Sequence, residues 1–579
     1  MATAANSGAH EIFRGWSERI AEHEDRLFLL LTILIGALVG LAVVAFILLT
    51  ENLAVRIYPA GGSAWRRVLA PVTGALVMGF LLSRYFPQAR GSGVPQTKAA
   101  MYAHGGFISL RTLLGKFFCT AVTLASGIPL GREGPSVQVG GGIASVLGRH
   151  LGLSESKVKA LIPVASAAAI AAAFNTPLAA VLFSLEEVMG DLHAPVLGSV
   201  VLASATSWIV LRLILGNAPL FRVPEYQLVH PVEFVVYAVL GLAGGLVSVA
   251  FVKALLGMRA RFLRLPKRTE WLQPLAGGVV VGLMGWFVPQ ALGVGYRHVG
   301  EALAGNLALR LMAILVALKF VAVTLSYASG NAGGIFGPSL FIGAMLGGTV
   351  GSVAHGLLPN YTAAPGAYAL VGMGALFAGI IRAPMTSVLM IFETTRDYTI
   401  IVPLMIANLT SFYISLRLQP EPIYDALAMQ DGVHLRSGKT RALRGRLLVS
   451  QAMRAGAEAL PAQMTADAAL AAMHKSGCRS WPVADETGLR GIMTTARLKQ
   501  ASAEGRATRT VGELLDGKSF PHVHSDQSLE LALERMGAAG VDALPVVARA
   551  NMHQIEGVIL LRELLAAYGV DGGGPSEEA

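Results

Sequence analysis

One long stretch without a charged side chain constrains this chain more than any other feature. From Phe320 to Ile381 there are 62 residues and no Asp, Glu, Lys or Arg. About 20 apolar residues span a bilayer as a helix, so this stretch is long enough for more than one crossing. Glycine and proline interrupt it repeatedly, which predicts short, broken helices. Leu27–Thr50 is a second uncharged run of spanning length, and together the two runs predict a polytopic membrane protein.

Charge is concentrated at the C-terminal end. Of the 149 residues after Gln430, 34 are charged, against 48 of the first 430. The first three-quarters therefore has the composition of a membrane domain, and the last quarter that of a soluble domain. The net charge of +10 fits cytoplasmic loops beside anionic membrane lipid. Because no basic patch with interleaved aromatic residues accompanies it, we expect no nucleic-acid partner.

The membrane part contains an internal duplication. A shift of 203 residues aligns 116–148 with 319–351 and matches eleven of the 33 positions, among them an ordered series that runs from Lys-Phe to Gly-Pro-Ser. A shift of 207 extends the match to Glu186 and Glu393. Duplicated membrane domains with broken helices hold their substrate near the midplane, where the halves meet. Helix N-termini that point there carry N–H groups and a positive dipole end, which suits an anion.

The C-terminal part contains a second duplication, at a shift of 63 residues. It pairs Met473 with Met536 and Pro482-Val483 with Pro545-Val546. Each copy is expected to form a helix, a short strand after the Pro-Val pair, a second strand and a second helix. The expected fold is a paired α/β module.

Three glycine-rich breaks interrupt the membrane helices, at Gly91-Ser-Gly-Val-Pro95, Gly131-Arg-Glu-Gly-Pro135 and Gly334-Ile-Phe-Gly-Pro338. Proline suits the first helical turn, where its missing N–H costs nothing. One such break alone would indicate only the end of one helix and the start of the next, but three in a duplicated domain predict a binding site. The residues that shape this backbone are Gly91, Gly93, Pro95, Gly131, Gly134, Pro135, Gly334 and Pro338.

Glu133 and the pair Glu186-Glu187 are acids within or at the end of apolar segments. An acid inside a membrane costs about 2.5–3.5 kcal/mol on insertion scales, so Glu133 is expected to have a function. At a helix N-terminus its carboxylate can occupy an anion site and leave when protonated, which predicts both a gate and a proton acceptor. The structural alternative is an ion pair with Arg132. For the Glu186-Glu187 pair, the sequence leaves open solvated helix-end charges or a second proton site.

The three breaks, followed by Tyr424 in Pro422-Ile-Tyr-Asp425, closely resemble the CLC chloride channels and chloride/proton antiporters. The resemblance covers residues from about 25 to 426. The C-terminal part resembles a pair of CBS domains. The implied fold is an all-α polytopic membrane domain of two inverted repeats, followed by a small α/β CBS pair.

The resemblance also implies roles for individual residues. Ser92 and Tyr424 match the hydroxyls that hold a central chloride, and Ile335 and Phe336 match the residues whose backbone N–H groups bind it. Glu133 matches the external gating glutamate. Glu187 matches the internal proton-transfer glutamate, which channels of the family usually lack, so its presence favours coupled exchange.

Two departures from the family pattern bear on regulation and conduction. Gln96 stands where the family usually has an acid, beside the anion route. In CBS pairs, a Thr or Ser and an Asp commonly hold an adenine nucleotide. The first copy keeps Thr494 but has Arg497 at the acid position, and the second keeps Glu563 but has Leu560 at the hydroxyl position. An adenine nucleotide could be bound only by Thr494 of the first copy and Glu563 of the second, because neither copy has both the hydroxyl and the acid.

We therefore expect a chloride/proton antiporter, not an enzyme, that needs no cofactor or metal. It is expected to be a homodimer, surrounded by lipid in a plasma membrane, with its CBS domains in the cytoplasm. The alternatives are a passive voltage- or pH-gated chloride channel of the same fold and a CBS-regulated cation transporter. The predicted parts are a cytoplasmic amphipathic segment (1–26), the membrane domain (27–426, repeats about 27–216 and 230–420), a linker (427–446), two CBS domains (447–508 and 509–570) and a disordered tail (571–579).

Overall fold

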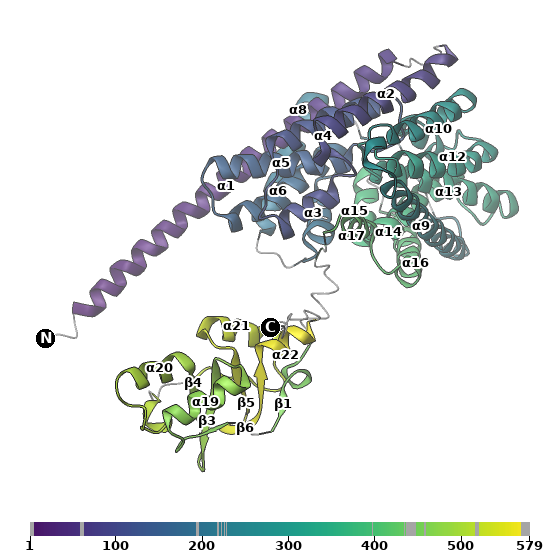
Figure 1. The fold of residues 1–579 in the computed structure, drawn as a ribbon. Coiled ribbons are helices and arrows are strands. Elements are labelled where there is room, and N and C mark those ends of the chain that lie inside the picture. The colour runs from purple at the N-terminus through teal and green to yellow at the C-terminus, as the bar shows by residue number, and fades with distance from the viewer. Residues whose placement is uncertain are drawn as a thin grey trace. The chain divides into compact units, whose positions relative to one another are not determined.

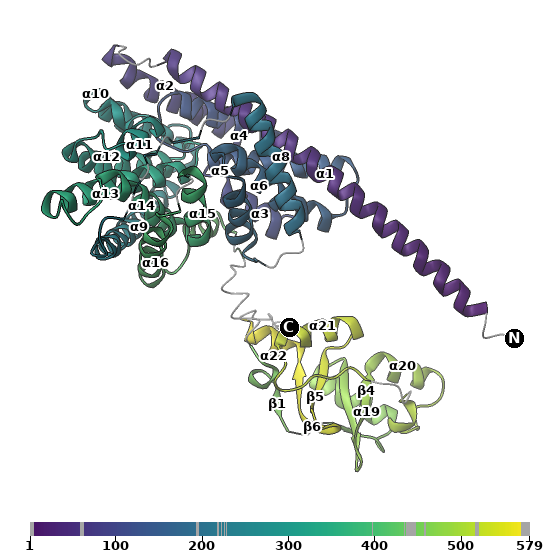
Figure 2. The same cartoon turned by 180° about the vertical axis from the view of Figure 1, so that it is seen from behind.

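The chain divides into two compact units, Met1–Leu435 and Arg436–Ala579, which we call the membrane unit and the tail unit (Figures 1 and 2). The predicted tail, 571–579, lies outside the described residues. The computed structural model describes residues 5–57, 63–192, 196–216, 219–221, 223–224, 226, 228–395, 398–433, 435, 447–456, 459–515 and 520–568.

Within the described residues, the α-helices of the membrane unit form two consecutive sets of eight, followed by a last short helix. The first set is α1 (Ala5–Ile57), α2 (Ala64–Arg84), α3 (Val94–Ala103), α4 (Leu110–Ala125), α5 (Glu133–His150), α6 (Glu155–Phe174), α7 (Pro177–Phe183) and α8 (Leu197–Leu215). The second is α9 (Glu233–Leu263), α10 (Gln273–Phe287), α11 (Tyr296–Leu303), α12 (Leu309–Ala328), α13 (Phe336–Leu357), α14 (Pro365–Ile381), α15 (Pro384–Thr395) and α16 (Ile401–Leu418).

The last helix of the membrane unit, α17 (Ile423–Gln430), extends into the segment predicted as a polar linker. The linker does not begin at 427, because Leu427 and Ala428 are buried against the membrane unit. Most of the rest of the predicted linker lies outside the described residues.

Corresponding helices of the two sets pack in the same way. α5 lies against α6 as α13 lies against α14, and α8 packs on α1 as α16 packs on α9. Glycine allows the closest of these approaches: a Cβ on Gly347 of α13 would lie 2.0 Å from the carbonyl oxygen of Tyr368 in α14. Without a hydrophobic driving force inside lipid, such close contacts between small residues hold membrane helices together.

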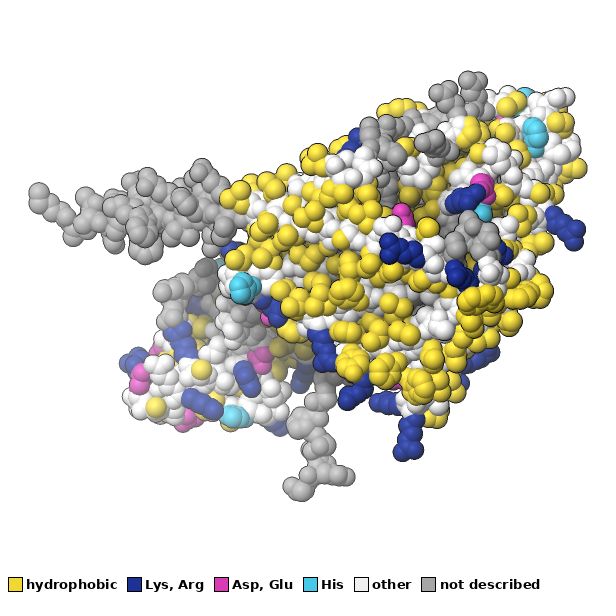
Figure 3. Space-filling view, turned by 90° about the horizontal axis from the view of Figure 1, so that it is seen from above, with side chains coloured by type: hydrophobic (Ala, Val, Ile, Leu, Met, Phe, Trp, Pro, Cys, Tyr) yellow, Lys and Arg dark blue, Asp and Glu magenta, His cyan; other side chains and the backbone are white. Residues whose placement is uncertain are grey.

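Eight of the described helices are long and apolar enough to cross a membrane. Others, such as α3 and α7, are far too short to span one. Figure 3 shows apolar side chains over much of the face of the membrane unit that it presents. Large apolar side chains such as Leu213 and Phe287 are about 80% exposed, as expected of a surface that faces lipid.

The tail unit contains two three-stranded sheets with strand orders β1-β6-β5 and β2-β3-β4. β3 and β5 begin two residues before their Pro-Val pairs, because Ser480 pairs with Thr494 and Ala543 pairs with Leu560. The elements are β1 (Arg454–Ala455), β2 (Leu460–Pro461), α19 (Ala466–Ser476), β3 (Ser480–Asp485), β4 (Gly488–Thr494), α20 (Thr495–Ala503), α21 (Leu529–Ala539), β5 (Ala543–Ala548), β6 (Asn551–Leu560) and α22 (Leu561–Ala567).

The two copies in the tail unit exchange their first segments, which differs from the contiguous copies 447–508 and 509–570 of the sequence analysis. β1 pairs with β6 of the second copy, and Val449 packs in the core of that copy. Conversely, Val511 and Leu514 pack in the core of the first copy. The physical reason is that each segment buries its apolar residues against the other copy's sheet.

Candidate functional site

The N-termini of α5 and α13 meet at equivalent positions of the two repeats. Gly131 and Gly334 form an antiparallel bridge, in which the N–H of Gly131 donates to Gly334 at 2.6 Å and the reverse bond is 2.7 Å long. Reciprocal contacts between equivalent residues indicate an approximate two-fold axis. The glycine-rich breaks of the two repeats therefore form one structure.

The start of α3 completes this structure from the first repeat. Gly93 has φ of +106°, and a Cβ there would lie 2.3 Å from the carbonyl oxygen of Gly134. A Cβ on Gly134 would in turn lie 2.6 Å from the carbonyl oxygen of Ser92. Only glycine allows this approach, which brings Ser92 to the N-terminus of α5.

Glu133 is fully buried at the first position of α5 and reaches across to the second repeat. Its Oε2 accepts the N–H of Gly337, at the N-terminus of α13, at 3.2 Å. Its Oε1 accepts a hydrogen bond from the hydroxyl of Tyr296. The carboxylate thus occupies an anion-binding position at a helix N-terminus. The alternative ion pair with Arg132 is not seen, because that guanidinium binds Glu51 at 3.1 Å.

The hydroxyls of Ser92 and Tyr424 are buried, and neither forms a hydrogen bond with any other residue that the structure describes. Buried polar groups are rarely left without a partner. The two hydroxyls are therefore available to donate to an anion.

Ile335 and Phe336 lie at the N-cap and the first position of α13. The first N–H groups of a helix have no partner within it, and neither of these amides donates to another described residue. The ring of Phe336 packs against Phe174 and Phe377 at centroid distances of 4.7 and 4.4 Å. Aromatic packing from both repeats therefore fixes the helix end that carries these free N–H groups.

Two buried lysines hold the loops that precede α3 and α11, and the sequence analysis gave them no role. Lys116 donates to the carbonyl oxygens of Ala89 and Gly91, at 3.0 and 2.5 Å. Lys319 makes the equivalent bonds to Ala291 and Gly293, at 3.1 and 2.5 Å. The match of the two lysines in the internal duplication was the signal that could have identified them.

The carboxylates of Glu186 and Glu393 each cap a helix of the opposite repeat. Glu393 accepts the N–H groups of Leu178 and Ala179 at the start of α7, at 2.9 and 2.7 Å. Glu186 accepts the N–H groups of Met385 and Thr386 at the start of α15, at 3.4 and 2.9 Å. Glu186 therefore caps the start of α15.

Glu187 lies on a π-helical turn (Ser184–Met189) that follows α7, and it is 6% exposed. It forms an ion pair with Lys98 of α3 at 2.8 Å. Lys98 also binds Asp425 of α17 at 2.6 Å. Neither Lys98 nor Asp425 was predicted from the sequence; the only available signal was that Asp425 directly follows Tyr424.

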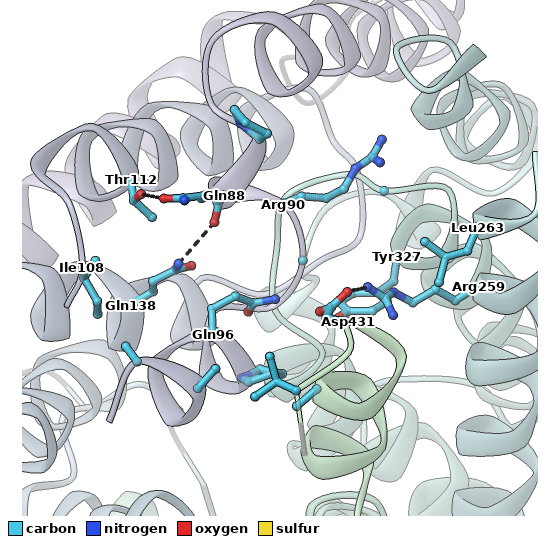
Figure 4. Close-up of a pocket in the computed structure, with 18 of the residues that line it drawn as sticks. Gln88, Arg90, Gln96, Ile108, Thr112, Gln138, Arg259, Leu263, Tyr327 and Asp431 are labelled. Carbon is cyan, nitrogen blue, oxygen red and sulfur yellow. Dashed lines mark hydrogen bonds and ion pairs between the residues drawn. The ribbon is translucent and has the colours of Figure 1, made fainter. Parts of the chain in front are cut away.

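A cavity of about 720 Å³ lies beside this site, bordered by Gly91, Gln96 and Tyr327 (Figure 4). The Gln96 side chain accepts the N–H of Gly93 at 2.8 Å, so it caps α3 without placing a negative charge there. Two arginines in the lining are each neutralised: Arg90 by Glu270 and Arg259 by Asp431. The cavity thus reaches Gly91, the residue that precedes Ser92.

The two residues expected to contact a nucleotide in the tail unit are both engaged. Thr494 caps α20, where its hydroxyl accepts the N–H of Arg497 at 3.4 Å. Glu563 forms an ion pair with Arg454.

Comparison with known proteins places this chain among membrane transporters. The model of the voltage gated chloride channel family matches residues 73–416, and a CBS domain model matches residues 511–569. The chain belongs to the voltage gated chloride channel family. Its membrane unit and tail unit thus confirm the predicted CLC-type helical domain followed by an α/β CBS pair.

Several relatives of this family member carry functional names. The H(+)/Cl(-) exchange transporter ClcA of Vibrio campbellii is 33% identical over 364 residues, which cover 62% of this chain and 78% of that protein. The putative chloride channel protein ClcB-like of Ralstonia nicotianae is 34% identical over 352 residues, 60% of this chain and 82% of that protein.

Solved structures of the family share this fold. A slow cyanobacterial Cl−/H+ antiporter is 26% identical with a TM-score of 0.64, and the match covers 70% of this chain and 97% of that one. A eukaryotic CLC transporter is 19% identical with a TM-score of 0.62, and the match covers 93% of this chain and 97% of that chain. The likeness in fold therefore extends to the tail unit.

Proposed function

We propose that this chain is a chloride/proton antiporter in which Glu133 is both the gate and the outer proton acceptor. The observation that carries the proposal is the contact between its carboxylate and the N–H of Gly337. A chloride ion would accept the same N–H group. The carboxylate and the anion therefore compete for one position at the N-terminus of α13.

Protonation of Glu133 drives the exchange step. A protonated carboxyl no longer carries the charge that the helix dipole and the N–H of Gly337 attract. The side chain then leaves, and chloride takes its place. Chloride held by the hydroxyls of Ser92 and Tyr424 and the amides of Ile335 and Phe336 would lie next along the path. One proton is thus bound as one anion position opens, which couples the two movements.

Glu187 is the inner proton acceptor in this proposal. It is an ionisable group buried in a membrane domain, which is expensive unless it has a partner or a function. Its ion pair with Lys98 of α3, the helix whose first turn follows Ser92, supports a position near the anion path. Protons would pass between Glu187 and Glu133, while chloride reaches Ser92 through the cavity beside Gly91.

The proposed topology places the tail unit in the cytoplasm of a homodimer in a plasma membrane. The loop between α9 and α10 carries Arg264, Lys267 and Arg268, and basic loops remain on the cytoplasmic side. Arg259, near the end of α9, binds Gln430 and Asp431 at the end of α17. The segment that leads to the tail unit therefore starts on that basic side, beside anionic lipid.

The test is chloride-driven proton movement in liposomes that contain the purified protein. An outward chloride gradient should move protons inward against their own gradient. Glu133→Ala and Glu187→Gln should each abolish proton movement while chloride still flows. Chloride flux without proton movement in the unmutated protein would instead identify a passive channel.

A further inference from the structure

Lys98 holds two buried carboxylates at once, each from a different helix or turn. Its Nζ lies 2.8 Å from Glu187 and 2.6 Å from Asp425. All three side chains are less than 10% exposed. Ion pairs in such surroundings are weakly screened by salt, so each partner strongly affects the charge of the others.

The position of Lys98 in the fold connects the proton site to the anion site. It lies on α3, whose first turn follows Ser92, and Asp425 directly follows Tyr424 on α17. One ammonium group therefore joins the turn that carries Glu187 to the two segments that carry the hydroxyls of the anion site. No other lysine or arginine binds Glu187 in the part of the chain that the structure describes.

The remaining surroundings of Glu187 are uncharged apart from one neighbour. The buried residues of α6 and α7, which also pack against its turn, carry no charge. Glu186, next to it in sequence, is bound to the start of α15. Tyr102 donates to the carbonyl of Met189 at the end of the turn. Lys98, which binds Glu187, and Asp425, which binds the same ammonium group, are thus the charges expected to set the proton affinity of this site.

We propose that Lys98 is a positioning residue that binds Asp425 and Glu187 together and thereby sets the internal pH range over which Glu187 exchanges protons. The inference rests on the proposed antiport function. With Glu187 ionised, the three groups carry a net charge of −1, and one added proton makes them neutral. Protonation therefore removes the excess negative charge without leaving Lys98 unpaired, because Asp425 still binds it.

The proposal predicts opposite effects of removing each partner. Lys98→Met leaves two neighbouring carboxylates without a cation, so Glu187 should take up a proton at higher pH. Asp425→Asn leaves Lys98 to Glu187 alone, so Glu187 should take up a proton only at lower pH. The internal pH of half-maximal proton transport should move by about one unit or more in each direction. The double variant should lie between the two single variants.

The experiment measures proton and chloride flux in liposomes over a series of internal pH values. Lys98→Arg keeps the charge and should keep the profile of the unmutated protein. Lys159→Met is the matched control, because Lys159 forms an exposed ion pair with Glu155 at 2.6 Å, away from this site. It should leave both fluxes and the profile unchanged.

The outcomes separate this inference from the proposed function. Opposite shifts in Lys98→Met and Asp425→Asn, with chloride flux retained, support the inference. Shifts in the same direction, or no shift in either variant, overturn it while antiport in the unmutated protein stands. If one variant does not fold, the direction of the pH shift in the other variant decides whether the inference stands. An unmutated protein that moves no protons would instead refute the proposed function.

Discussion

Replacement of Gly93 by alanine tests whether the close approach of α3 and α5 builds the anion site. The new Cβ would lie 2.3 Å from the carbonyl oxygen of Gly134, whereas Cβ atoms do not approach other atoms within 3.0 Å. The carbonyl must therefore move by about 0.7 Å or more to relieve the overlap. The backbone at Gly93, with φ of +106° and ψ of −42°, lies outside the conformations that alanine readily adopts, so the substitution also carries a backbone cost.

This displacement moves Ser92 relative to the N-terminus of α5. A misplacement of about 1 Å at a site of fixed geometry can cost about 100-fold in rate. We expect Gly93→Ala to lower chloride efflux from liposomes by 10- to 100-fold, on the order that such misplacements produce. The purified protein should still be folded, as judged by size-exclusion chromatography and its unfolding temperature.

Gly152→Ala is the matched control, because Gly152 has φ of +72° and no atom lies within 4 Å of the added Cβ. It carries the backbone cost without the overlap, and its chloride flux should stay within about two-fold of the unmutated protein. The approach of the two helices does not shape the site if the chloride flux of Gly93→Ala equals that of the unmutated protein. The same conclusion follows if Gly152→Ala loses as much chloride flux as Gly93→Ala.

Three further predictions concern the helix caps and the tail unit. Glu393→Gln loses one charge-assisted hydrogen bond to the start of α7 and weakens the other, so it should lower the free energy of unfolding in mixed micelles by about 2–3 kcal/mol; an unchanged value would remove its assigned role. Hydrogen bonds from Thr487 hold the pKa of the Asp485 carboxyl below its ordinary value. The ionised carboxyl therefore stabilises the fold above about pH 4, and this stabilisation is lost as the pH falls through the lowered pKa. The unfolding temperature of the tail unit should fall on acidification, and it should fall less in Asp485→Asn. Because Glu563 binds Arg454, ATP or AMP should not raise that temperature; a clear increase would show that a nucleotide displaces the arginine.

The sequence was sufficient to predict the features that repeat along the chain. The duplication, the three glycine-rich breaks and the position of Glu133 at a helix start all follow from local patterns, and the family comparisons confirm the fold. The roles of Ser92, Ile335, Phe336, Tyr424, Glu133 and Glu187 stay predictions. Their placement in the structure supplies the geometry from which the proposed function is argued.

Contacts between distant segments could not be predicted in the same way. Lys98 and Asp425 are 327 residues apart, and Tyr296 and Glu133 are 163 apart. No periodicity marks such pairs, because each residue has an ordinary local context. The exchange in the tail unit was hidden for a different reason: β1 and β2 have two residues each, too few to show an alternating pattern.

The reciprocal caps of Glu186 and Glu393 have a consequence for the order in which the protein is synthesised. Leu178 leaves the ribosome 215 residues before Glu393, an interval of about 10–40 s at ordinary rates of synthesis. Until then the N–H groups at the start of α7 lack their carboxylate, and unsatisfied polar groups inside a membrane cost several kcal/mol each. The first half of the membrane unit therefore cannot reach its final packing while the second half is still being inserted. A nascent chain that stops before α15 should remain open to proteases and to the insertion machinery, however apolar its completed helices are.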